Sequence, residues 1–185
     1  NTSNTATVTI TITPANDTPT FNSPGTQTGA ENSLVTFTMA GTDVDGDTLT
    51  YQLNAPPAGS SYDTGTGQFS WTPGFDVVTP AQGQRTFSLV FLATDGNGGT
   101  DLEGLDLIIQ NTNRPPTIDA LAGDQTGNEG DTLDFTASAS DADAQTLTYT
   151  WTFGDGSNPV AGVGLTAVSH LYPQNGNFTL QLTVT

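Results

Sequence analysis

Short runs in which apolar residues alternate with polar ones, mostly threonine, recur along the chain of 185 residues. A period of two is typical of strands with one buried face. Turn-forming clusters such as Asp45-Gly46-Asp47 separate the runs, and no window has the apolar spacing of a helix. The sequence therefore predicts an all-β chain built from the short strands of β-sandwiches. The expected strands include residues 7–13, 34–39, 48–53, 87–92, 105–109, 132–135, 146–151 and 178–184.

The charge and the rare residue types exclude several functions. The chain has 19 Asp and Glu against 2 Lys and Arg, which gives a net charge of −17. Nucleic acids and anionic membranes need basic patches, so neither is an expected partner. No apolar run is long enough to insert into a membrane. Cysteine is absent and His170 is the one histidine, so we expect no enzyme. Low hydrophobicity with high charge is also typical of disorder, but the patterned apolar residues favour a folded chain.

An internal repeat divides the chain into two related parts. Glu31 precedes Asp43 by twelve residues, and Glu129 precedes Asp141 by twelve. In each copy an Asp-x-Asp pair is followed at the same distance by Thr-Leu-Thr-Tyr. Repeats of this kind indicate repeated structural units. Two sandwiches are therefore predicted, one over residues 16–112 and the other over residues 113–185.

The second copy lacks the last turn and strand that the first copy has at residues 95–109. Matching parts stand at the other end of the chain, where Asn1-Thr2-Ser3-Asn4 can form the turn. Residues 1–15 are therefore interpreted as the last strand of such a sandwich. The residues that would make this interaction are Thr5, Thr7, Val8, Thr9, Ile10, Thr11, Ile12 and Thr13.

An unpaired strand and an open sheet edge are each an aggregation hazard and can pair with one another. Head-to-tail pairing does not close on itself and produces a filament. The expected partners are therefore identical neighbouring units, either repeats of one continuous array or separate subunits. The alternative interpretation is that residues 5–13 are the leftover strand of an unrelated upstream domain.

Residues 16–112 resemble the cadherin-like and dystroglycan-type Ig repeats of bacterial surface proteins. The matching motifs are Asn16-Asp17-x-Pro19, Glu31, Asp43-Val44-Asp45-Gly46-Asp47-x-Leu49-x-Tyr51, residues 66–73 and Ala93-Thr94-Asp95-Gly96. The resemblance implies a seven-stranded sandwich in an extracellular, cell-surface or secreted protein. Such repeats serve as stalks, adhesin repeats and accessory modules.

Residues 113–185 resemble a polycystic-kidney-disease (PKD) domain. The matching motifs are Asn113-x-Pro115-Pro116, Ser140-Asp141-x-Asp143, Tyr149-x-Trp151-x-Phe153-Gly154-Asp155-Gly156, His170-x-Tyr172 and residues 176–184. The PKD pattern normally continues with one more strand, which supports the assignment of residues 5–13. The competing function is a polysaccharide-binding or spacer module of a secreted hydrolase that contacts surface glycans. Its candidate aromatic residues are Tyr62, Phe69 and Phe75.

The acidic loops are candidates for Ca²⁺, which prefers six to eight oxygen ligands. The first expected site lies at one end of the first sandwich, beside the junction, and Asp47 is either a further ligand or a turn residue. The alternative is that Asp-Gly-Asp is only a solvated turn. The ligands proposed for this site are Asn16, Asp17, Glu31, Asp43, Asp45 and Asp95.

A second, doubtful calcium site involves Asn113, Glu129, Asp141 and Asp143. Arg114 stands where the first copy has Asp17, and a guanidinium beside a cation site lowers its affinity. The alternative is that Arg114 binds those carboxylates without metal.

Overall fold

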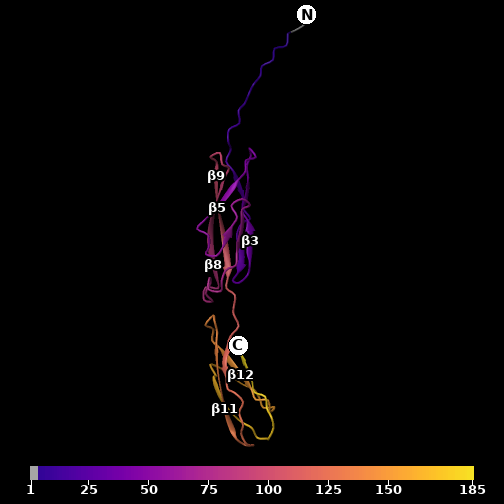
Figure 1. Ribbon diagram of the computed structural model, residues 1–185, viewed down its shortest axis with the longest axis vertical. Helices are drawn as coiled ribbons and strands as arrows, with labels where there is room; N and C mark the ends of the chain where they lie inside the picture. The colour runs from indigo at the N-terminus through magenta and orange to yellow at the C-terminus, as the bar shows by residue number, and fades with distance from the viewer. Residues whose placement is uncertain (1–3) are drawn as a thin grey trace. The chain divides into compact units, whose positions relative to one another are not determined.

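The computed structural model describes residues 4–185, and these contain strands, turns and irregular segments. Contacts divide the chain into unit 1, Asn1–Thr112, and unit 2, Asn113–Thr185 (Figure 1). Within the described residues there is no helix that could cross a membrane. The strands of unit 1 are β1 (Thr20–Asn22), β2 (Gln27–Ala30), β3 (Val35–Thr38), β4 (Ala40–Thr42), β5 (Thr50–Asn54), β6 (Ser61–Tyr62), β7 (Gln68–Trp71), β8 (Gln84–Thr94) and β9 (Thr100–Gln110). Those of unit 2 are β10 (Thr117–Leu121), β11 (Thr132–Ser140), β12 (Thr148–Thr152), β13 (Val160–Val163), β14 (Ala167–Leu171) and β15 (Gln181–Val184).

Unit 1 is a sandwich of two main sheets. One sheet has the order β2-β9-β8-β5 and the other the order β3-β7-β6, while β1 pairs with β4. Strand β2 runs parallel to the last residues of β9, and the other pairs are antiparallel. The aromatic ring of Phe91 on β8 packs against Phe37 on β3 and Tyr62 on β6, which joins the two sheets.

The core of unit 1 follows from the alternating sequence. On β9, Leu105, Leu107 and Ile109 point inward and are at most 4% exposed. The turn before β7 depends on Gly67, whose φ is +71° and which approaches the carbonyl of Met39 closely enough that a Cβ would collide with it. Glycine tolerates this conformation at little cost. The alternation therefore determines which face of β9 is buried. Gly67 permits the turn that leads into β7.

Unit 2 has two three-stranded sheets, with the orders β10-β11-β14 and β13-β12-β15. Trp151 is fully buried between them, and Phe135 packs against Phe153. Strand β15 pairs with β12 on one side, and no described residue pairs with its other side. The second sheet therefore ends at β15 with open backbone groups.

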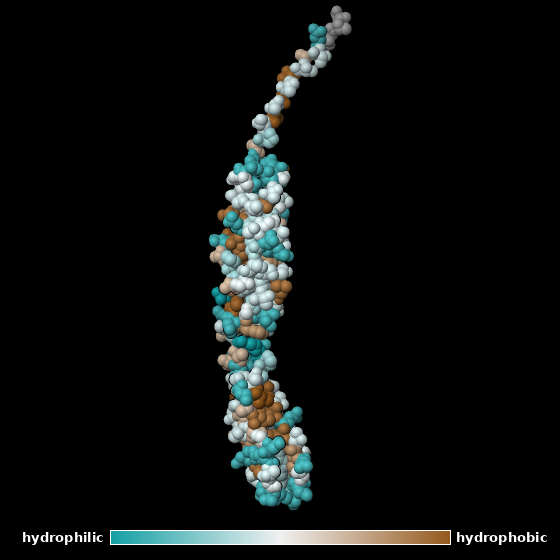
Figure 2. Space-filling model, in the orientation of Figure 1, coloured by the Kyte–Doolittle hydropathy of each residue, from teal (hydrophilic) through white to brown (hydrophobic). Residues whose placement is uncertain are grey.

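Residues 4–15 form no strand. Residues 4–13 are exposed, and Val8, Ile10 and Ile12 are between 79% and 85% exposed. Figure 2 shows hydrophobic and neutral residues alternating along this segment. The pattern is that of a strand, but none of the described residues supplies a partner. The turn expected at Asn1, Thr2 and Ser3 lies outside the described residues.

The predicted all-β class and the tandem sandwich architecture are confirmed. Of the expected strands, those at residues 87–92 and 105–109 are longer than the alternation indicated and form β8 and β9.

Candidate metal centre

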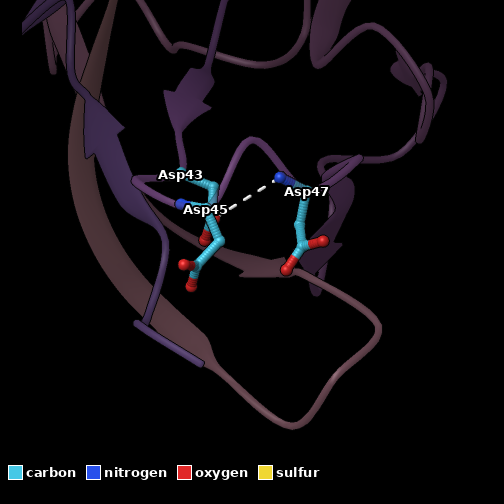
Figure 3. Close-up of side chains that lie close together, drawn as sticks. All are labelled: Asp43, Asp45 and Asp47. Atoms are coloured by element: carbon cyan, nitrogen blue, oxygen red, sulfur yellow. Dashed lines mark hydrogen bonds between the residues drawn. The ribbon is translucent and has the colours of Figure 1, made fainter. Parts of the chain in front are cut away.

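The first group of acidic side chains comes from the loop between β4 and β5. Oδ1 of Asp43 accepts the backbone N–H groups of Asp45, at 2.8 Å, and Asp47, at 3.4 Å. This turn brings one carboxylate oxygen from each of the three residues within 4.8 Å of the others (Figure 3). The second carboxylate oxygen of Asp43 is buried and has no hydrogen-bond partner.

The turn between β8 and β9 adds a fourth carboxylate. Asp95 is 5% exposed, and it accepts the N–H groups of Asn97, at 2.7 Å, and Gly99, at 2.9 Å. The amide of Asn97 donates to Asp47 Oδ2 at 2.8 Å, which ties the two loops together. We refer to Asp43, Asp45, Asp47 and Asp95 as the carboxylate cluster.

The segment that enters unit 1 is bound to the same cluster. Asn16 Nδ2 donates to Asp95 Oδ2 at 2.8 Å, and the backbone N–H of Asp17 donates to Asp45 Oδ2 at 2.7 Å. The Asn16 amide is the main reason that the pKa of Asp95 lies below its usual range, with further bonds from backbone N–H groups of its turn. Asp95 is therefore ionised at neutral pH, and these hydrogen bonds hold residues 16 and 17 against the cluster.

The donor set of the cluster suits a hard divalent cation. All its side-chain ligands are oxygens, as Ca²⁺ requires, and histidine and cysteine take no part. A buried carboxylate oxygen without a partner is costly unless something satisfies it. The orphaned oxygen of Asp43 is therefore the observation that fits a bound cation.

The structure brings together most of the residues expected in the first site. Asn16, Asp17, Asp43, Asp45 and Asp95 all take part in the contacts described above. Asp47, which the sequence left open between ligand and turn, has its carboxylate in the cluster. Sequence reasoning missed Asn97, although its place between glycines in the turn after Asp95 marks it as a residue of the same loop.

The expectation that Glu31 lies with these aspartates is wrong. Glu31 is 1% exposed, and its carboxylate accepts the N–H groups of Val78, at 2.7 Å, and Thr112, at 3.1 Å. The physical reason is the parallel pairing of β2 with β9, which places Ala30 opposite Gln110. Asp95 precedes the other end of β9, so the length of that strand separates the two carboxyl groups. Glu31 therefore lies at the end of unit 1 that is opposite to Asp95.

The second expected site contains an ion pair. The Arg114 guanidinium donates from Nη2 to Asp143 Oδ1 at 2.6 Å, and the Arg114 backbone N–H donates to Asp143 Oδ2 at 2.6 Å. These bonds hold the pKa of Asp143 below its usual range. Asp141 accepts the N–H groups of Asp143 and Gln145 through Oδ1, and its Oδ2 is buried without a partner. The Arg114–Asp143 ion pair is the alternative that the sequence left open for this site, while the unpartnered Asp141 oxygen is the same feature that Asp43 has in unit 1.

The other two residues of that set lie apart from this ion pair. Glu129 is exposed and precedes β11, whereas Asp141 follows the last residue of that strand, so the nine residues of β11 separate the two carboxyl groups. Asn113 is exposed, and its amide donates to the carbonyl of Arg114 at 3.4 Å. The expectation that Glu129 joins the two aspartates is therefore wrong, for the reason that applies to Glu31: it belongs to the segment at the opposite end of its sandwich.

Aromatic side chains proposed as a glycan platform serve the core instead. Phe69 is fully buried and stacks on Phe37, while Tyr62 is half-buried against Phe91. Burial raises the pKa of Tyr62 to about 12. A flat row of exposed rings over Tyr62 and Phe69 is therefore not formed.

Solved structures similar to this chain include cadherin repeats. No curated protein sequence matches the chain. Among solved structures, human protocadherin-24 EC1-2 is 19% identical, covers 73% of this chain and 66% of its own, and has a TM-score of 0.43. Drosophila N-cadherin EC1-4 is 18% identical, covers 86% of this chain and 50% of its own, and has a TM-score of 0.48. This chain thus spans less than two thirds of either solved chain.

Family comparisons divide the sequence in the same place as its contacts. Residues 16–107 match the family described as bacterial Ig domain, and residues 113–185 match the family described as PKD domain. Both are non-catalytic modules that are typical of extracellular proteins. The chain therefore contains a region similar to bacterial Ig domains, followed by a region similar to PKD domains.

Proposed function

We propose that this chain is an extracellular structural repeat of a surface filament, stalk or adhesin, assembled head to tail by β-strand complementation and rigidified by calcium. The observation that carries the proposal is a pair of complementary defects. Residues 5–13 form an extended, alternating segment with exposed Val8, Ile10 and Ile12, and β15 ends its sheet without a partner. Each feature exposes backbone groups that the other can satisfy.

Calcium has a mechanical role in this proposal. The carboxylate cluster would hold the ion together with oxygens from Asn16 and Asp17, which directly follow the donor segment. A bound Ca²⁺ would offset two of the negative charges of the carboxylate cluster and fix the point where residues 5–13 leave unit 1. Sites in extracellular modules bind Ca²⁺ with dissociation constants of about 10⁻⁴–10⁻³ M, so millimolar calcium would fill this one.

Calcium titration of the melting temperature tests the metal centre. Saturating Ca²⁺ is expected to raise the melting temperature of unit 1, and EDTA is expected to reverse the change, because an ion bound to the folded state stabilises it. Asp45→Asn should weaken the response. The matched control is Asp106→Asn, which removes one charge from β9 and keeps an oxygen for Ser88. An identical melting temperature in Ca²⁺ and EDTA would refute the calcium part of the proposal.

A further inference from the structure

Unit 2 contains an open slot beside β15. The hollow has a volume of about 660 Å³ and is lined by the loop between β10 and β11, by the loop between β14 and β15, and by residues of β11. Gln125, Gly127 and Asn128 belong to one segment, while Phe178 and Leu180 belong to the other. The side chain of Leu133 on β11 also lines it and remains partly exposed. The slot therefore has backbone groups on both sides and apolar side chains within.

Strand β9 fills the corresponding position in unit 1. It pairs on one side with β2, where Gln27 lies opposite Leu107, and on the other with β8, where Leu89 lies opposite Leu105. The sequence Gln27-Thr28-Gly29 recurs as Gln125-Thr126-Gly127, and the latter is in the wall of the slot. The slot is therefore the place of a strand equivalent to β9.

The N-terminal segment matches β9 residue by residue. Val8, Ile10 and Ile12 precede Leu105, Leu107 and Ile109 by 97 positions each, as Asn16 precedes Asn113. The three residues on β9 are buried, whereas the three N-terminal ones are exposed. Because a shift of one residue would turn every apolar side chain outward, this match defines a single register.

We infer that residues 5–13 of a second copy occupy the slot in the register of β9, and that Glu129 anchors them by accepting the backbone N–H of Ala15. This inference rests on the proposed head-to-tail assembly and assigns its register and its anchor. In that register Ile10 lies beside Gln125 as Leu107 lies beside Gln27, and Val8 lies opposite Leu180.

Glu31 shows how such an anchor works. Its Oε2 accepts the backbone N–H of Thr112 at 3.1 Å, just beyond the end of β9, and its side chain is 1% exposed. Glu129 holds the same place after Gln125-Thr126-Gly127, and Ala15 precedes Thr112 by the same 97 positions. Glu129 is exposed, and no hydrogen bond or ion pair of its side chain is present among residues 4–185. The incoming strand supplies the N–H that Glu129 lacks.

A donor from a second copy fits this geometry better than the chain's own N-terminal segment. Asn16 is bound to Asp95 at one end of β9, while Thr112, the last residue of unit 1, is bound to Glu31 at the other. Eleven residues of strand span about 35 Å. Residues 4–15 reach at most about 40 Å when fully extended. With residues 5–13 in the slot, only Pro14 and Ala15 would connect them to Asn16, which is bound to Asp95.

Peptide binding to the full chain tests both the register of residues 5–13 in the slot and the anchoring by Glu129. The receptor is the full chain with Ile10→Asp, so that its own segment does not compete, and the probe is a peptide of residues 4–16 measured by calorimetry in EDTA. The peptide is expected to bind, and a peptide of the same composition with its apolar residues moved by one position is not. Glu129→Gln in the receptor should weaken binding about tenfold, as loss of a hydrogen bond to a charged group does. Asp124→Asn, an exposed acid that also lines the slot, is the matched control.

N-methylation of Ala15 in the peptide tests whether its backbone N–H is the group that donates to Glu129. It should weaken binding to the same degree as Glu129→Gln, and it should cause no further loss with the Glu129→Gln receptor. Equal affinity for the two receptors, or an effect of Glu129→Gln that appears only with Ca²⁺, would overturn the anchor and leave strand complementation standing. If the peptide of residues 4–16 does not bind, complementation itself fails, and the head-to-tail assembly fails with it.

Discussion

At the scale of single residues, Gly99 controls the geometry of the carboxylate cluster. A Cβ at this position would collide with Asp95 Oδ2 and approach the Asp17 carbonyl oxygen at 3.1 Å. Gly99→Ala is therefore expected to displace the Asp95 carboxylate and reduce calcium affinity about 10- to 100-fold, as loss of ligand support does. Calorimetric titration with CaCl₂ measures the change.

Gly104→Ala is the control for this substitution. Gly104 lies on β9, the strand that directly follows Gly99, and a Cβ there would meet nothing within 4 Å. It should leave calcium affinity unchanged. Equal affinities of both variants and the wild-type chain would show that Asp95 does not hold the ion.

Arg114 decides the character of the acidic pair in unit 2. Arg114→Asp restores the residue type that unit 1 has at Asp17 and removes the charge that now binds Asp143. Asp141 and Asp143 would then repel the new carboxylate at position 114. The melting temperature of unit 2 should therefore fall in EDTA and recover with Ca²⁺. The wild-type unit 2 should show neither effect. A variant that melts identically with and without Ca²⁺ would mean that Asp141 and Asp143 cannot form a cation site.

At the scale of elements, Asp155 joins the turn after β12 to strand β14. Its carboxylate accepts the Ser157 hydroxyl at 2.6 Å and lies 2.8 Å from His170 Nε2. These contacts, the Ser157 hydroxyl first, hold the pKa of Asp155 well below its ordinary value. Because the unfolded chain then binds the proton more readily, Asp155 stabilises unit 2 above about pH 4 and loses this contribution as the pH falls further.

Urea unfolding between pH 6 and pH 2.5 measures that contribution. Asp155→Asn is expected to lower the unfolding midpoint of unit 2 at pH 6 and to reduce the loss of stability on acidification. Asp124→Asn, which changes an exposed acid of the same unit, should keep the wild-type slope. If Asp155→Asn leaves the pH dependence of the unfolding midpoint unchanged, Asp155 does not stabilise unit 2 in this way.

Strong alternation made the long strands of the fold predictable. Residues 105–109 show the inward-facing Leu105, Leu107 and Ile109 that the structure buries on β9. The short strands β1, β2, β4 and β6 were not predicted, because two to four residues are too few to show a period. Their pairing depends on neighbours distant in sequence, as Thr20 opposite Thr42 illustrates.

Loop residues allowed part of the candidate site to be predicted. Asp43 and Asp45 are two residues apart in sequence, so a single turn brings them together. Glu31 belongs to the same repeated motif as Asp43, but it lies at the other end of the sandwich. Each residue of a strand adds about 3.3 Å, so residues that are close in sequence can lie tens of ångströms apart. Spacing alone therefore does not reveal which end of a sandwich a residue occupies.

At the scale of the whole molecule, strand donation predicts concentration-dependent assembly. Each copy offers one donor segment and one slot, so association does not close, and negative-stain images should show unbranched filaments. Sedimentation velocity should show a mean size that rises with concentration. Hydrogen exchange should be slowed at residues 5–13 in the assembled sample, because their backbone groups are then hydrogen-bonded.

Ile10→Asp is expected to abolish this assembly, since it would place a charge in the apolar slot. Thr9→Asp is the matched control, because Thr9 faces away from the slot in the inferred register. Monomers of the wild-type chain at all concentrations, or equal assembly of both variants, would contradict head-to-tail donation.

The sequence by itself determined the all-β class, the repeated units, the acidic loops and the alternating pattern of residues 5–13, because these depend on local periodicity and on turn-forming residues. Tertiary structure decided which carboxylates meet: β9 separates Glu31 from Asp95, and Arg114 neutralises Asp143. It also decided that β15 ends at an open slot while residues 5–13 remain unpaired. Pairing between segments far apart in sequence is set by the packing of sheets, and no local pattern encodes it.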